Sequence, residues 1–260
     1  MFQSQHGVEL ADRGFTIFRE VLGSGEVQTL RDVCGQVYAK TKQTSVPASQ
    51  FLSILELAVV PFRPLVVDCL KELLGSDYVT IPEFSMLTET FGGWHTDAGS
   101  QGYADYIYAR NYLQVECGIY LQDNDDNCGG GLDVVPGSHK EPTHLGKPGS
   151  ITRRLARRIC NHLRRPVSVN TKAGDLIVWH FRLLHKATPQ TGLRADRLKH
   201  GIFWGAAPMT HDVKKYMEHM SSRQEQFYAD ISSLTYPSSY PKEVLELVRR
   251  GNLQVASRLP

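Results

Sequence analysis

The stretch Phe91-Gly92-Gly93-Trp94-His95-Thr96-Asp97 organises the rest of the chain. If it is extended, His95 and Asp97 project from one face, because alternate side chains of a strand point the same way. An imidazole and a carboxylate so placed offer a metal ion two adjacent ligands. The ordinary alternatives are a solvated strand end or a local hydrogen bond between the two side chains. The metal interpretation therefore requires a third ligand elsewhere in the sequence.

The composition is that of an ordinary globular protein. The 260 residues are 41% hydrophobic and 22% charged, which suits one large domain or two small ones. The net charge of +2 gives no general argument for nucleic acid. No stretch approaches the ~18 apolar residues of a membrane span, and the N-terminus lacks a charged segment followed by an apolar run. We therefore expect no nucleic-acid or membrane partner, and a monomer or homodimer.

Five cysteines occur without a Cys-x-x-Cys pair. An odd number in this arrangement disfavours both a disulfide framework and a structural zinc site. Together with the lack of a leader pattern, they predict reduced thiols in a cytoplasmic protein. They are Cys34, Cys69, Cys117, Cys128 and Cys160.

The first part of the chain, about residues 1–77, carries a short strand and two helical patterns. The strand is expected over residues 14–18. Ser24 can cap a helix with an apolar stripe, and a second helix is expected to begin at Pro64 and to stop at Gly75. These elements would support the remainder of the domain.

Short apolar runs separated by Gly, Pro, Asn and Asp follow, from about residue 78 to 207. They predict a sandwich or barrel rather than a parallel sheet. The runs cover residues 78–81, 84–91, 112–121, 132–135, 167–169, 176–181 and 198–204. Helical spacing returns towards the C-terminus, over about 208–260. We predict a single domain over residues 1–260, mostly β with flanking helices.

The third metal ligand is expected after the turn Ala173-Gly174-Asp175. If the chain stays extended from there, His185 falls on the face of the preceding apolar side chains, and His180 lies on the opposite face. This alternation favours His185, unless a bulge shifts the register. Arg197 can reach the same site from the adjacent strand and offer a planar fork to a carboxylate, with Arg194 as its competitor. The alternatives are a structural histidine and a surface arginine.

Taken in order, these elements resemble the phytanoyl-CoA dioxygenase family of Fe(II)- and 2-oxoglutarate-dependent oxygenases. The resemblance spans roughly residues 14–204 and depends most on Pro136-Gly137-Ser138-His139 and its spacing from the metal motif. It implies a double-stranded β-helix, a cupin-like jelly roll whose open end holds iron. The matching elements are His95-Thr96-Asp97, Gly130-Gly131-Leu132-Asp133-Val134-Val135-Pro136-Gly137-Ser138-His139, Ala173-Gly174-Asp175, His185 and Arg197.

The resemblance also implies roles for individual residues. His95, Asp97 and His185 would ligate Fe(II), and Arg197 would bind the distal carboxylate of 2-oxoglutarate. The interval from His185 to Arg197 is one residue longer than the family leads us to expect, so Arg194 stays an alternative. Two further residues, Thr188 and Gln114, would lie near the cosubstrate, and His139 would shape its turn by hydrogen bonding.

The implied reaction consumes O2 and 2-oxoglutarate, releases succinate and CO2, and most simply hydroxylates a small organic molecule. Asp97 argues against halogenation, since related halogenases have a small residue there. Two rival interpretations are a cupin-like metal dioxygenase or isomerase that does not use 2-oxoglutarate, and a non-catalytic binding protein on the same barrel. Arg197 disfavours the first, because a simple metal isomerase needs no cation for a cosubstrate carboxylate. The complete set of three metal ligands disfavours the second.

The substrate site is expected near the barrel mouth. Residues 98–111 form an insert that is either a lid or a surface loop. We expect a compact anionic or polar substrate, with Arg110, Arg182 and Tyr108 as candidate contacts. Residues 153–165 place Leu155, Ile159 and Leu163 at helical spacing beneath six arginines, which indicates a solvated basic helix rather than an anion-binding surface.

Overall fold

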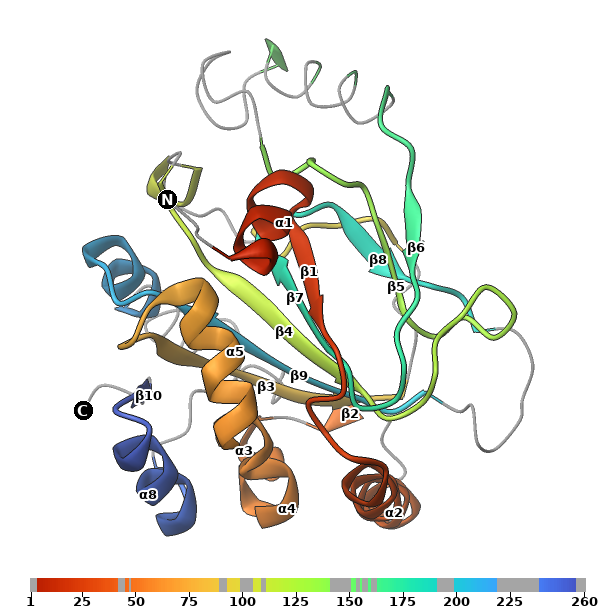
Figure 1. Ribbon diagram of the computed structural model, residues 1–260, viewed down its shortest axis with the longest axis vertical. Coiled ribbons are helices and arrows are strands. Elements are labelled where there is room, and N and C mark those ends of the chain that lie inside the picture. The colour runs from red at the N-terminus through yellow and green to blue at the C-terminus, as the bar shows by residue number, and fades with distance from the viewer. Residues whose placement is uncertain are drawn as a thin grey trace.

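Two β-sheets with helices on one side form the computed structural model (Figure 1). The structure describes residues 4–41, 45–46, 48–88, 93–98, 105–108, 111–140, 151–152, 155, 159, 163–190, 199–218 and 239–255. The larger sheet has the order β1 (Phe15–Phe18), β7 (Leu176–His180), β4 (Val115–Tyr120), β9 (Gly201–Ala207), β3 (Val79–Leu87) and β10 (Gln254–Val255), with β2 (Ser45–Val46) also paired to β3. The smaller sheet has the order β6 (Val167–Val169), β5 (Leu132–Val134) and β8 (His185–Ala187). These described strands form two separate sheets and not one closed barrel.

Helices cover the outer face of the larger sheet (Figure 1). They are α1 (Gln5–Arg13), α2 (Ser24–Thr41), α3 (Ala48–Ser53), α4 (Leu55–Ala58), α5 (Pro64–Leu74) and α8 (Lys242–Arg250), with the short 3-10 turn η1 (Val60–Phe62). The 3-10 turn η2 (Asp105–Tyr108) and a helical segment over 211–218 pack instead in a separate cluster with Val79 and Ile81, the alternate side chains of β3. The outward side chains of β4, Val115, Cys117 and Ile119, are fully buried in this core. None of the described helices is long and apolar enough to cross a membrane.

The alternate side chains of the larger sheet face the smaller sheet, across what we call the inter-sheet space. Trp179 and Tyr120 from the larger sheet pack there with Leu132 and Val134 from the smaller one. At Gly118 a Cβ atom would lie 2.9 Å from the ring of Phe203, so only glycine leaves room for the aromatic side chains. The mostly β fold with flanking helices and a jelly-roll core, expected from the sequence, is confirmed.

The turn at Ala173-Gly174-Asp175 leads into β7, whose first residue, Leu176, pairs with Phe18 at the end of β1. Asp175 is 1% exposed and accepts hydrogen bonds from Arg19 Nη1 at 2.6 Å, Glu20 N at 3.0 Å and Lys172 N at 2.8 Å. This carboxylate therefore ties the end of β1 to the start of β7, and through them holds the site-bearing strand β7 in place.

One expectation about regular structure is wrong. The runs 78–81 and 84–91 are not separate strands. Residues from both runs form one strand, β3, and its pairing register with β9 shifts between Ile81 and Ser85. Pro82 lies at this shift, and proline has no N–H to donate to the ladder. The strand ends at Leu87, and residues 89–92 lie outside the described part.

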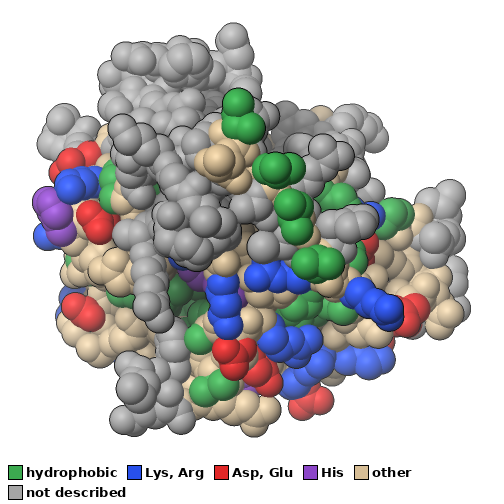
Figure 2. Space-filling view, turned by 90° about the horizontal axis from the view of Figure 1, so that it is seen from above, with side chains coloured by type: hydrophobic (Ala, Val, Ile, Leu, Met, Phe, Trp, Pro, Cys, Tyr) green, Lys and Arg blue, Asp and Glu red, His purple; other side chains and the backbone are tan. Residues whose placement is uncertain are grey.

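The sequence predicts a solvated helix face over residues 153–165, and the three apolar side chains of that segment that the structure describes are exposed. The fractional exposures are 57% for Leu155, 52% for Ile159 and 79% for Leu163. On the face seen from above, Figure 2 shows hydrophobic side chains in a row among atoms that the structure does not describe. Residues 153, 154 and 156–158 belong to that undescribed part, so the basic helix as a whole is untested.

Candidate metal centre

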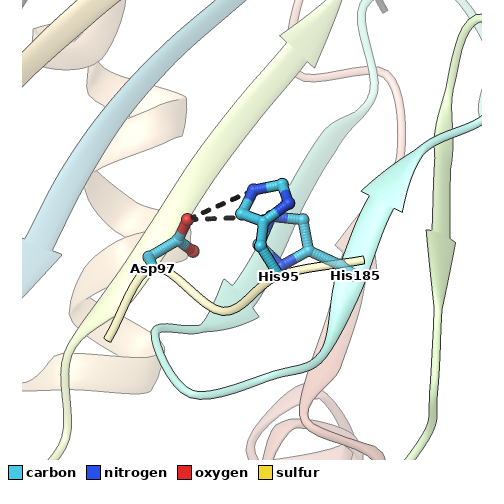
Figure 3. A group of neighbouring side chains, drawn as sticks. All are labelled: His95, Asp97 and His185. Carbon is cyan, nitrogen blue, oxygen red and sulfur yellow. Dashed lines mark ion pairs between the residues drawn. The ribbon is translucent and has the colours of Figure 1, made fainter. Parts of the chain in front are cut away.

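Three side chains converge at the edge where the two sheets meet. The ligand atoms of His95, Asp97 and His185 all lie within 4.8 Å of one another. His185 Nε2 lies 3.7 Å from Asp97 Oδ1, and His95 Nε2 lies 4.0 Å from the same oxygen (Figure 3). The structure therefore brings together the three residues that the sequence singled out.

Backbone pairing positions the two histidines. His95 N donates to His185 O at 2.9 Å, and His185 N donates to His95 O at 2.9 Å. These two bonds form an isolated antiparallel bridge, and the imidazole ring centroids lie 4.3 Å apart. His185 is the first residue of β8, so the edge of the smaller sheet carries both rings.

The outer nitrogen of each imidazole is held by a backbone carbonyl. His95 Nδ1 lies 2.9 Å from Gly93 O, and His185 Nδ1 lies 2.9 Å from Leu183 O. A carbonyl oxygen only accepts, so each Nδ1 carries the proton, and Nε2 presents its lone pair to the centre. Burial lowers the pKa of His185, which favours its neutral, ligating form.

Asp97 is oriented by a tryptophan from the opposite sheet. Trp179 Nε1 donates to Asp97 Oδ2 at 3.2 Å, so Oδ1 is the oxygen that faces the histidines. Two imidazole lone pairs and one carboxylate oxygen then point at a common position, with separations too long for hydrogen bonds among them. This is the donor set of a 2-His-1-carboxylate metal site.

His185 is the residue that the sequence favoured as third ligand, but the extended strand from which it was predicted is wrong. The chain does not stay extended: β7 ends at His180, Leu183 N donates to His180 O at 2.7 Å, and β8 starts at His185 on the other sheet. The expected strand through His95 and Asp97 is also wrong, since Asp97 lies in a turn. Long-range contacts produce both turns, and an alternation rule cannot detect them.

The turn before His185 is held by the Pro-Gly-Ser-His element. Ser138 Oγ accepts from Leu184 N at 2.8 Å, and Val135 N donates to Leu184 O at 2.9 Å. His139 Nε2 donates to Ala11 O at 3.1 Å, so this histidine does act through hydrogen bonding, although its partner is helix α1 and not its own turn. The element thereby fixes where β8 begins.

His180 lies apart from the three converging ligands, in a buried pair with His139. The two ring centroids lie 5.1 Å apart, and His180 Nδ1 accepts from Arg182 N at 3.1 Å. Burial lowers the pKa of His139 to about 4 and holds the pKa of His180 well below its usual value. Both rings are therefore neutral parts of the core.

The expected cosubstrate residues are partly described. Gln114 is fully buried, its Oε1 accepts from the Tyr112 hydroxyl at 2.6 Å, and its Nε2 has no hydrogen-bond partner within the described part of the chain. The Thr188 hydroxyl donates to Asp133 Oδ1 at 2.7 Å. Arg197 and Arg194 lie outside the described residues.

The insert over residues 98–111 is anchored where it is described. Ile107 in η2 is fully buried, and Arg182 Nη1 donates to Ile107 O at 3.2 Å. Arg182 is itself 6% exposed, so it lies inside the protein and braces the insert. Arg110 and the side chain of Tyr108 lie outside the described part.

The role of Trp179 in orienting Asp97 is not predicted from the sequence. Trp179 lies two residues after Ile177, so the alternation of the strand predicts that both side chains share one face. Nothing in the sequence pairs Trp179 with Asp97. The burial of Lys199, which is 4% exposed, is likewise not predicted. Lys199 lies four residues before the inward-facing Phe203, so alternation along an extended strand would have placed it on the inner face.

Comparison with known families gives one match. The sequence model of the phytanoyl-CoA dioxygenase (PhyH) family matches residues 10–197. A comparison with curated proteins finds no match to this chain.

Comparison with solved structures gives many matches of low sequence identity. The non-heme alpha ketoglutarate dependent carbocyclase SnoK from nogalamycin biosynthesis has a TM-score of 0.60 and 20% identity, covering 82% of this chain and 90% of that one. HygX from Streptomyces hygroscopicus, with nickel and 2-oxoglutarate bound, has a TM-score of 0.59 and 17% identity, covering 79% and 87%. EctD from S. alaskensis, with bound Fe, has a TM-score of 0.57 and 16% identity, covering 79% and 76%. At these identities the likeness shows a shared fold.

Proposed function

The chain belongs to the phytanoyl-CoA dioxygenase family, and from this premise we propose that it is an Fe(II)- and 2-oxoglutarate-dependent oxygenase. Its substrate would be a small organic molecule, and its products a hydroxylated molecule, succinate and CO2. The observation that supports the proposal most is the convergence of His95 Nε2, His185 Nε2 and Asp97 Oδ1 on one position. Structures of this fold with iron or nickel and 2-oxoglutarate bound, SnoN and HygX, add to it.

The residues present fit an iron ion and a 2-oxo acid. His95, Asp97 and His185 would hold the ion from one side and would leave room for a chelating cosubstrate and O2. Gln114 Nε2, buried without a hydrogen-bond partner among the described residues, is a donor available to an oxygen-rich ligand. Iron with 2-oxoglutarate supplies the oxidising chemistry when bound.

The chain itself contributes positioning. Trp179 holds Asp97 so that one oxygen is presented, and the two backbone carbonyls at Gly93 and Leu183 hold both imidazoles in the ligating tautomer. His185 is 5% exposed and His95 is 42% exposed, so the centre has a buried side and an open side. Substrate would approach from the side of His95.

Further assignments are proposals that follow from the same function. Arg197 would bind the distal carboxylate of 2-oxoglutarate, with Thr188 and Gln114 near it. Arg110, Arg182 and Tyr108 are the proposed substrate contacts; the buried contact of Arg182 with Ile107 suits a role in holding the insert over the substrate. A single domain, a monomer or homodimer and a cytoplasmic location stay predictions.

The finer reaction type is also a proposal. Asp97 fills the carboxylate position and so favours hydroxylation over halogenation. Proteins of the same fold include the epimerase SnoN and the carbocyclase SnoK, so the fold does not select among oxidative outcomes.

An anaerobic titration tests the proposal. Protein with Fe(II) and 2-oxoglutarate should show a weak visible charge-transfer band that requires both additions, because only a 2-oxo acid chelated to iron produces it. A band with iron and 2-oxoglutarate, absent with iron and succinate, would support the assignment. No band at saturating concentrations would refute it. A screen for compounds that accelerate succinate release would then identify the substrate.

A further inference from the structure

A row of exposed apolar side chains lies on the helical residues that lead towards β6. Residues 151, 152, 155, 159 and 163 are helical, and helical residues four apart are neighbours on one face. All of the apolar ones are exposed, Ile151 by 82% and Leu163 by 79%. Figure 2 shows hydrophobic side chains in a row on the face seen from above, with Lys and Arg side chains beside one end of it. The apolar row, as we call it, consists of Ile151, Leu155, Ile159 and Leu163.

The apolar row differs from other exposed apolar side chains in the described part of the chain. Val8 on α1, Leu65 on α5 and Leu245 on α8 are each about half exposed, but they belong to three separate helices. Single exposed apolar side chains are common on proteins, whereas a contiguous set marks a surface that interacts with another body. The apolar row is therefore a candidate interaction surface, and its surroundings indicate the partner.

The segment that carries the row is strongly basic. Residues 142–174 contain eight Lys or Arg residues and no Asp or Glu, although the whole chain has 27 acidic residues. Six of the eight are arginines within residues 153–165, interspersed with the row or directly after it. Of these, Arg164 and Arg165 belong to the described part, and Arg165 is exposed. A partner that complements this segment is anionic as well as apolar.

The chain directly after the row is docked on the smaller sheet. Arg164 lies against the Pro-Gly-Ser-His element, since a Cβ atom at Gly137 would lie 3.7 Å from Arg164 Nε. Val167 then begins β6 and pairs with Val134 of β5, which in turn pairs with His185 of β8. The row is thereby connected, through two strand pairings, to the candidate metal centre.

Two kinds of partner fit this surface less well. In a symmetric pair of copies the same patch meets itself, so the arginines of one copy would repel those of the other. A nucleic acid would neutralise the arginines through its phosphates but would leave the apolar row in contact with water. The surface of an anionic bilayer instead offers phosphates and, just beneath them, hydrocarbon.

We propose that the apolar row and its arginines bind the surface of a membrane that contains anionic lipids. The apolar side chains would enter the boundary between headgroups and acyl chains, and the arginines would pair with lipid phosphates. The expectation of no membrane partner depended on the lack of a spanning segment, and a helix that lies on a bilayer needs none. This inference goes beyond the proposed oxygenase function and does not depend on it.

Vesicle co-sedimentation tests the proposal on the full chain. The wild type should bind vesicles of equal parts phosphatidylglycerol and phosphatidylcholine, and should bind vesicles of phosphatidylcholine alone far more weakly. Raising the ionic strength from about 0.1 M to about 1 M should weaken the binding, because salt screens the attraction between arginines and lipid phosphates. Equal binding to both kinds of vesicle, or no binding to either, would overturn the proposal.

A triple variant tests the apolar row itself. Leu155→Gln, Ile159→Gln and Leu163→Gln together should lower partitioning into the anionic vesicles about 10- to 100-fold, because hydrocarbon that the bilayer would bury is lost. The three side chains are exposed, so the variant should fold, and circular dichroism checks this. If it sediments with the vesicles like the wild type, the row is not the membrane contact and the proposal is wrong.

The matched control removes the same number of exposed apolar side chains from separate helices. It combines Val8→Gln, Leu65→Gln and Leu245→Gln, and it should bind the anionic vesicles like the wild type. An equal loss in both triple variants would mean that general surface hydrophobicity, and not the row, governs binding. That result would also contradict the proposal.

The charge is tested with single substitutions. Arg165→Gln should weaken binding to the anionic vesicles about fivefold, the effect of one basic residue near an anionic surface. Arg250→Gln, at the exposed end of α8, is the control and should leave binding unchanged. No difference between the two variants would count against a contact of the basic segment with lipid phosphates.

The other partners correspond to distinct results. If the wild type is a dimer in sedimentation velocity and the triple variant of the row is a monomer, the row joins two copies of this chain. If the wild type binds duplex DNA but not the anionic vesicles, the arginines serve a phosphate backbone. Either result would replace the membrane assignment.

Discussion

His95 and His185 donate to each other's backbone carbonyl, with N–O distances of 2.9 Å in both directions. The spacing of the two imidazoles is thus set by main-chain pairing, which is stiffer than side-chain contact. A metal ion would meet ligands that are already in place, and little ordering would be required on binding.

Replacing any one of His95, Asp97 or His185 by Ala should abolish the charge-transfer band, because two ligands do not hold iron with the cosubstrate. His180→Asn is the control: it keeps an acceptor for Arg182 N, and His180 lies away from the three ligands. The band should be largely intact in this variant. Equal loss in His180→Asn would show that the ligand set is wrong.

Trp179→Phe should weaken metal binding about 10- to 100-fold, because the hydrogen bond that orients Asp97 is lost while the aromatic packing is kept. The measurement is competition with a chromophoric chelator. Trp204→Phe is the matched control, since Trp204 is fully buried on the other face of the sheet and its Nε1 has no described partner. If both variants bind metal equally, Trp179 does not position the carboxylate.

Arg197→Ala should raise the 2-oxoglutarate requirement about 10- to 1000-fold and change iron affinity far less, since the lost contact is a charge-assisted pair. Arg194→Ala serves as the comparison. Separate titrations of metal and cosubstrate provide the measurement. A larger effect in the Arg194 variant would exchange the roles of the two arginines.

Acid should destabilise the protein well before the carboxylates titrate. The pKa of His139 is lowered to about 4 in the folded state, so between pH 6.5 and 4 the unfolded chain binds a proton that the folded chain does not. Stability is therefore complete above about pH 6.5 and falls below it, by about 2 kcal/mol at pH 5 from this residue. His180 acts in the same direction. Denaturant unfolding from pH 8 to 5 measures the slope, which should be shallower in His139→Gln.

Asp175→Ala should lower stability by about 3 kcal/mol, because a buried carboxylate that accepts from Arg19 and two backbone N–H groups is removed. Asp12→Ala removes an exposed pair with Lys140 and should cost little. Thermal unfolding of both variants makes the comparison. Similar melting temperatures would mean that the turn does not depend on its carboxylate.

Elements whose signals are local could be predicted from the sequence. The helix from Pro64 ends at Leu74 with Gly75 at a φ of +95°, and the strand over 167–169 matches β6, because capping, proline geometry and alternation act within a few residues. The residue types of the metal centre could be predicted as well, since only certain side chains ligate iron and their order along the chain is distinctive.

Tertiary structure alone decided how those residues meet. The turn that carries His185 to the second sheet depends on Ser138, far away in the sequence, and the orientation of Asp97 depends on Trp179. Likewise, the burial of Lys199 follows from the packing of Tyr120 and Phe203 around it. Periodicity reports which face of an element is buried, whereas partners across a sheet are selected by the summed packing of the whole domain.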